Sequence, residues 1–135
     1  MGLLKTLILY LSTAVVFFAI DLIWLGLMNS RFYKVQLAEL MSDKVNWLPA
    51  ILFYLLFIVG LLLLVVLPAV EHDSWIRALL LGGLLGMVAY ATYDLTNLAS
   101  IKNWPIVVTM VDIVWGTILA ATVATISYFI AKALS

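Results

Sequence analysis

Residues 48–70 read LPAILFYLLFIVGLLLLVVLPAV, an apolar run without a single charged side chain. A helix needs about 20 consecutive apolar residues to cross the hydrocarbon core of a bilayer, and this run supplies them. Three further apolar segments of comparable length occupy roughly residues 4–28, 76–98 and 105–131. The sequence therefore predicts an all-α integral membrane bundle of four transmembrane helices, formed as one domain by residues 1–135.

The composition agrees with a membrane protein and excludes several other classes. Of the 135 residues, 67% are hydrophobic and 10% are charged, whereas soluble domains are about half apolar and a quarter charged. Seven basic and seven acidic residues give no net charge, so nucleic acid is not an expected partner. The absence of cysteine excludes disulfides, thiolate metal sites and a cysteine nucleophile.

The connections between the apolar segments differ in length. Residues 29–46 mix apolar and charged side chains, which predicts a short interfacial helix at about residues 30–41 with Phe32 and Leu40 turned toward the bilayer. The other two connections, around EHDS and SIKN, are tight. Short loops make sequential helices antiparallel neighbours.

Three carboxyl side chains interrupt the apolar runs: Asp21 in the first, Asp94 in the third and Asp112 in the fourth. In an up-and-down bundle, the ends of the first and third helices lie on the side where the fourth begins. All three residues then fall within about 5 to 11 Å of one membrane boundary. A central aspartate costs about 2.5 to 3.5 kcal/mol to insert, so it pairs, takes up a proton or lines a wet cavity. Because the spans hold lysine or arginine only at their first residues, Lys5 and Arg77, far from the aspartates, we expect a shared proton or a bound cation.

Residue spacing turns two of these aspartates toward the protein. The third span carries a polar stripe at helical offsets, formed by Tyr90, Tyr93, Asp94 and Asn97. Glycines extend this stripe toward the start of the span at four-residue spacing, and small residues follow Asp112 at the same spacing. Such spacing lets helices approach closely in lipid. We therefore expect Asp94 and Asp112 to face each other or a common cavity.

Two tryptophans each follow an aspartate by three positions, Trp24 after Asp21 and Trp115 after Asp112. We interpret them mainly as packing residues, although their rings could also wall a pocket and hold a cation by cation–π attraction. The aspartates could merely join helices by hydrogen bonds, each on the order of 1 kcal/mol. Three ionisable groups at one depth exceed that need, which favours a site.

The stretches DLIWLG, YATYDLTNLASIKNWP and MVDIVWG resemble a family of small bacterial inner-membrane proteins catalogued as domain of unknown function 2177. The resemblance covers nearly the whole chain and implies a four-helix membrane protein in the bacterial inner membrane. It implies no established activity. It marks as family-defining Asp21, Trp24, Tyr93, Asp94, Asn97, Asn103, Trp104, Pro105, Asp112 and Trp115.

The candidate site for a proton, a cation or another ligand comprises Asp21, Asp94, Asp112, Tyr93, Asn97, Trp24 and Trp115. Because no zinc, phosphate-loop or nucleophile motif occurs, no metal or cofactor is expected and no catalytic residue is assigned. The leading hypothesis is a transport or binding protein that uses the aspartates for a proton or cation, coupled to a small cationic or amphipathic solute. The alternatives are a membrane-embedded acid–base enzyme acting on a lipid or isoprenoid, and an accessory subunit of a membrane complex.

The sequence also allows predictions of the oligomeric state and of the orientation in the membrane. Bundles of this size rarely enclose a pathway alone, so we expect a homodimer surrounded by membrane lipids. Four cations, Arg31, Lys34, Lys44 and Lys102, share one face, against three on the other. The positive-inside rule then places both termini outside the cytoplasm.

Overall fold

The computed structural model describes residues 1–42, 44 and 46–135. Within this part of the chain every regular element is helical, and four helices are long and apolar enough to cross a membrane. The predicted all-α bundle is therefore confirmed. The first helix comprises α1 (Leu3–Met28), η1 (Asn29–Tyr33) and α2 (Lys34–Gln36), the second α3 (Trp47–Leu61), η2 (Leu62–Val66) and α4 (Leu67–Glu71), the third α5 (Trp75–Ser100), and the fourth α6 (Ile106–Leu134).

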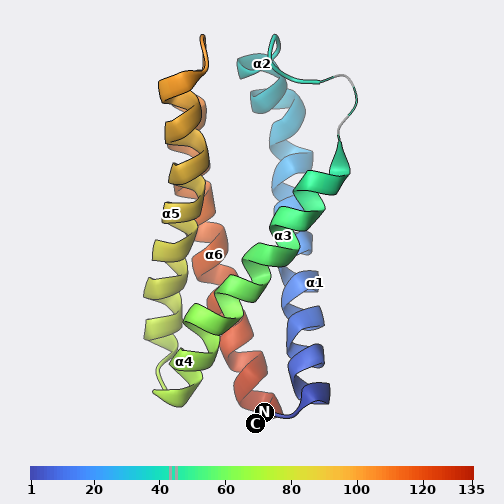
Figure 1. The fold of residues 1–135 in the computed structure, drawn as a ribbon, viewed down its shortest axis with the longest axis vertical. Coiled ribbons are helices and arrows are strands. Elements are labelled where there is room, and N and C mark those ends of the chain that lie inside the picture. The colour runs from blue at the N-terminus through green and yellow to red at the C-terminus, as the bar shows by residue number, and fades with distance from the viewer. Residues whose placement is uncertain (43, 45) are drawn as a thin grey trace.

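The four helices alternate in direction along the bundle. In Figure 1 both chain termini lie at the lower end, whereas the connection between α5 and α6 lies at the upper end. The two tight connections contain Asp73 with φ 50° and Asn103 with φ 62°. Aspartate and asparagine tolerate this left-handed conformation better than most side chains, so these residues favour tight turns between antiparallel helices.

The first helix is longer than the sequence suggested. It runs without a break from Leu3 to Gln36, about 50 Å at 1.5 Å per residue, whereas the hydrocarbon core is about 30 Å thick. The expected interfacial helix is thus present in part as α2, joined end-on to α1 (Figure 1). No glycine or proline stands between Gly26 and Pro49 to interrupt it. The joint, η1, is a widened turn in which the Lys34 amide donates to the Asn29 carbonyl.

Helices α5 and α6 pack backbone against backbone. A methyl group built on Gly82 would lie 2.5 Å from the Ala124 Cβ, and one on Gly86 would lie 2.5 Å from the Ala120 Cβ and collide with the Gly116 carbonyl oxygen. Glycine at these positions is what permits the approach. The small-residue spacing predicted this contact, which turns the polar side of α5 toward α6.

Aromatic and polar contacts join α1 to the other helices. The ring of Phe17 lies 5.3 Å from that of Tyr54 on α3, and the Tyr10 hydroxyl donates to the Leu55 carbonyl at 3.0 Å. Between α1 and α6, the hydroxyls of Thr13 and Ser127 share a buried hydrogen bond of 2.9 Å. Outward-facing side chains on every span are largely apolar, as lipid requires.

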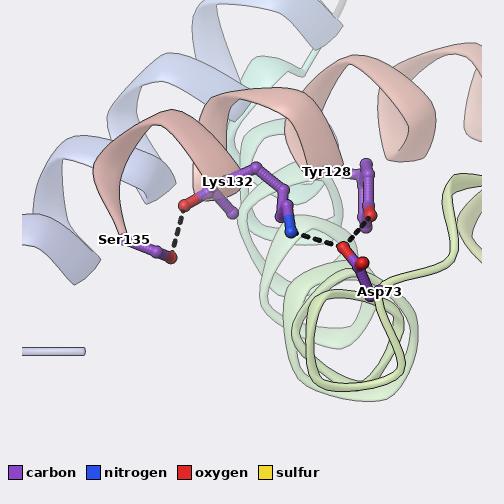
Figure 2. Close-up of polar contacts among 5 residues, drawn as sticks. Asp73, Tyr128, Lys132 and Ser135 are labelled. Carbon is purple, nitrogen blue, oxygen red and sulfur yellow. Dashed lines mark hydrogen bonds and ion pairs between the residues drawn. The ribbon is translucent and has the colours of Figure 1, made fainter.

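An ion pair at the end of the bundle that holds the termini ties a turn to a helix end. Figure 2 shows the side chains of Lys132 and Tyr128, both on α6, pointing to Asp73 in the turn before α5. The Tyr128 hydroxyl donates to Asp73 Oδ1 at 3.4 Å. The hydrogen bond from Lys132, followed by its positive charge, lowers the pKa of Asp73 from its ordinary value of 3.8. This pair lies far from the three aspartates in the spans.

Candidate functional site

The side chain of Asp94 is the most isolated polar group of the described chain. It is 0% exposed, and neither carboxyl oxygen has a hydrogen-bond partner among the described residues. Its backbone carbonyl does accept a bond, from the Thr109 hydroxyl at 3.3 Å, and the Trp104 indole donates in turn to that hydroxyl at 3.1 Å. These contacts fix the backbone of α5 but leave the carboxyl group without a donor.

The carboxyl group of Asp94 lies next to that of Asp112 on α6. The close packing of α5 on α6 at Gly82 and Gly86 brings the two helices together, and the ring of Tyr90, one turn before Asp94, packs on Gly116. If both groups were ionised, two negative charges would repel each other in a low-dielectric setting. A proton held between them would give Asp94 the donor that it lacks.

Asp112 also receives a hydrogen bond from the far end of the first helix. The Tyr33 hydroxyl donates to Asp112 Oδ1 at 2.5 Å, and the Trp24 indole donates to the Tyr33 oxygen at 3.1 Å. Tyr33 is the last residue of η1, and widened turns of this kind are frequent at functional sites. The continuation of α1 into η1 therefore supplies a donor for a carboxylate on α6.

Asp21 occupies a separate position beside this pair. It is 5% exposed, accepts a bond of 3.2 Å from the Trp115 indole and lies beside the Tyr54 hydroxyl. Its charge interacts with that of Asp112. In the part of the chain that is described, however, no three histidine, aspartate or glutamate side chains are arranged to hold a metal ion. The three aspartates thus share one region without converging on one point.

The two tryptophans stack on each other. Their ring centroids are 4.2 Å apart and their planes differ by 8°. The tryptophan of each Asp-x-x-Trp motif therefore forms a hydrogen bond that leads to the aspartate of the other motif. Trp115 of α6 donates to Asp21 of α1. Trp24 of α1 donates to the Tyr33 hydroxyl, which donates to Asp112 of α6. Because the rings cover each other, the stack closes one side of the region, as packing residues would.

A cavity of about 530 Å³ opens beside Asp112, between α3 and α5. A second cavity of about 290 Å³ adjoins it, because both are lined by Tyr54, Tyr90, Tyr93 and Asp112. The remaining lining of the larger cavity is mostly apolar and comprises Asn46, Pro49, Ala50, Phe53 and Ala89. Asp112 is thus the one carboxyl group that borders both the cavities and Asp94.

The predicted site residues fall into three positions. Five of them line the smaller cavity, namely Asp21, Trp24, Tyr93, Asp112 and Trp115. Asp94 lies next to Asp112 and lines neither of the two cavities. Asn97 lies beside the Tyr93 hydroxyl and lines neither cavity.

Three tyrosines at the site were outside the predicted set. Tyr90 belongs to the polar stripe but not to the candidate site. Tyr54 is the only side chain within residues 48–70 that carries a hydrogen-bonding group, and this signal could have identified it. Tyr33 could not be identified in this way, because its contact depends on how η1 turns the end of the first helix.

A family model described as "Predicted membrane protein (DUF2177)" matches residues 6–129. The match contains nearly all of the four spans and confirms the resemblance carried by the sequence stretches around the aspartates. No curated protein and no solved structure is detectably similar to the chain.

Proposed function

The chain belongs to the DUF2177 family of predicted membrane proteins, and from this premise we propose a small transport or binding protein that exchanges a proton or cation at Asp94 and Asp112. The exchange is coupled to a small solute in the adjoining cavity.

The buried, donorless carboxyl group of Asp94 is the observation that carries this proposal. An unpaired buried charge costs several kcal/mol, and purely structural hydrogen bonding would give Asp94 a partner. The free-energy cost of this buried charge is removed if Asp94 shares a proton with Asp112 or binds a cation. The only ion pair of the described residues, Lys132 with Asp73, lies at the other end of the bundle, so no basic side chain takes that place.

Asp112 connects the buried group to the outside. It borders Asp94 on one side and the cavities on the other, so a proton that leaves the pair has a route past it. The Tyr33 hydroxyl donates to Asp112, which stabilises the carboxylate after the proton has left. Together these contacts support reversible occupation of the pair.

The test compares Asp94→Asn and Asp112→Asn with the wild-type protein in detergent. Proton release into weakly buffered solution is measured while sodium ions or an organic ammonium ion are added, beside a thermal melt of each protein. We expect proton release from the wild type and none from either variant, with both variants folded. Asp73→Asn removes the same charge at the opposite end and serves as the matched control. A wild type that releases no proton with either cation would overturn the proposal.

A further inference from the structure

The larger cavity opens between two helices that are long and apolar enough to cross a membrane. Its walls come from α3 and α5, which are both spanning helices. Phe53 on α3 is 42% exposed and Tyr93 on α5 is 57% exposed, and side chains exposed on a spanning helix meet lipid. A molecule that reaches this cavity from the bilayer therefore passes between two apolar helices and carries an apolar part.

The inner end of the cavity has the opposite chemistry. Asp112 supplies a carboxyl group there, and among the residues that the structure describes no lysine or arginine lines the walls. The rings of Tyr54 and Tyr90 flank the space, and aromatic rings beside a carboxylate attract organic cations. A volume of about 530 Å³ lies within the usual range of about 300 to 1,000 Å³ for small-molecule sites.

We infer that the cavity binds a lipophilic organic monocation, an amine or quaternary ammonium with an apolar group, that enters from the bilayer between α3 and α5 and places its charged end at Asp112. This inference rests on the proposed function and names its substrate class. A metal ion fits less well, since the described residues offer no group of three acidic or histidine ligands.

Binding of such a cation displaces a proton. The positive charge beside Asp112 takes over the role of the proton shared with Asp94, and that proton passes to bulk water, so one positive charge replaces another. The other titratable groups that face the pair are Asp21 on α1, Tyr33 on η1, Tyr54 on α3, and Tyr90 and Tyr93 on α5.

The first experiment measures binding by calorimetry in lipid nanodiscs, with empty nanodiscs as the background. The probe is phenylbutyltrimethylammonium, compared with its uncharged carbon isostere, which has the same shape. We expect the cation to bind at least about tenfold more tightly than the isostere, and Asp112→Asn to weaken the cation by at least about tenfold. Asp73→Asn should leave its affinity unchanged. Equal binding of the cation and the isostere would show an apolar lipid site and overturn the inference.

The second experiment fills the cavity. Ala89→Phe adds a ring to the α5 wall, and Ala50→Phe adds one to the α3 wall, so one variant can replace the other if it does not fold. Either folded variant should lose binding of the ammonium probe, and retained affinity in both would overturn the inference.

Proton release separates the two proposals. If sodium alone releases a proton that requires Asp94 and Asp112, while the ammonium probe does not bind, the substrate class is wrong and the proposed function stands. If neither cation releases a proton, both proposals fail.

Discussion

The hydroxyl of Tyr33 donates a hydrogen bond of 2.5 Å to the carboxylate of Asp112, across 79 positions of the chain. The contact exists because the first helix continues past the length that a bilayer requires. Its widened turn, η1, places the Tyr33 hydroxyl against Asp112 of α6. The extension of the first helix beyond Met28 therefore supplies a hydrogen-bond donor to Asp112, the carboxyl group that borders the cavities.

Replacing Tyr33 with phenylalanine tests this bond. The change keeps the ring and removes the donor to a carboxylate, which costs about 1.5 to 3 kcal/mol. Tyr10→Phe is the matched control, because Tyr10 donates to a neutral backbone carbonyl and such a bond contributes only about 0.5 to 1.5 kcal/mol. We expect a larger drop in the melting temperature in detergent for Tyr33→Phe than for Tyr10→Phe. The reverse order would contradict a charge-assisted bond to Asp112.

Replacing Gly86 with alanine tests the contact between α5 and α6. The added methyl group would collide with the Gly116 carbonyl oxygen, a backbone atom that cannot rotate away, and overpacking of this kind costs about 1 to 3 kcal/mol. Gly60→Ala is the control, because a methyl group there has no described atom within 4 Å beyond its own stretch of helix, and alanine favours a helix by about 1 kcal/mol. Thermal melts should show Gly86→Ala less stable than wild type and Gly60→Ala at least as stable. Similar melting of both variants would mean that the helices are not in close contact.

Replacing Asp94 with asparagine separates stability from function. No protein donor to the carboxyl group is lost, and the asparagine amide can donate to Asp112 in place of the shared proton. We expect the variant to melt at or above the wild-type temperature and to lose cation-linked proton release. Earlier melting of Asp94→Asn would instead assign the residue to holding the helices together.

Asp73 gives a prediction of pH dependence. Its pKa is lowered in the folded protein by Lys132, so its contribution to stability is complete above the ordinary value of 3.8 and is lost as the pH falls through the lowered pKa. Asp73→Asn should melt slightly below wild type at pH 7, and the difference should shrink as the pH falls below 3.8 and through the lowered pKa. The effect is small because the pair is exposed to solvent. A difference that persisted at low pH would exclude the ion pair as its cause.

The sequence predicts the spans well because lipid imposes one requirement on all of them. Residues 48–70 had to form a spanning helix, and the second helix runs from Trp47 to Glu71. The glycine and alanine spacing likewise predicted the contact between α5 and α6, which brings Asp94 beside Asp112. Local composition and periodicity are sufficient for these features.

Features that depend on how distant segments meet were not predictable in this way. The break expected after Met28 is absent, because no glycine or proline follows that point before Pro49 to end the helix. The contact of Tyr33 with Asp112 follows from that continuation. The homodimer, the bacterial inner membrane and the placement of both termini outside the cytoplasm stay predictions. Because the small-residue groove of α5 is already filled by α6, a homodimer would have to use other faces.

The hydrogen bonds that join the two Asp-x-x-Trp motifs have a consequence for biosynthesis. Asp21 lies 94 positions before the tryptophan that donates to it, so the first span leaves the ribosome long before its partner exists. Until the fourth span is inserted, the first span holds a carboxyl group in the membrane without its indole donor. The site is therefore completed only when the fourth span is inserted, and a nascent chain halted before that span keeps a polar face without its donor.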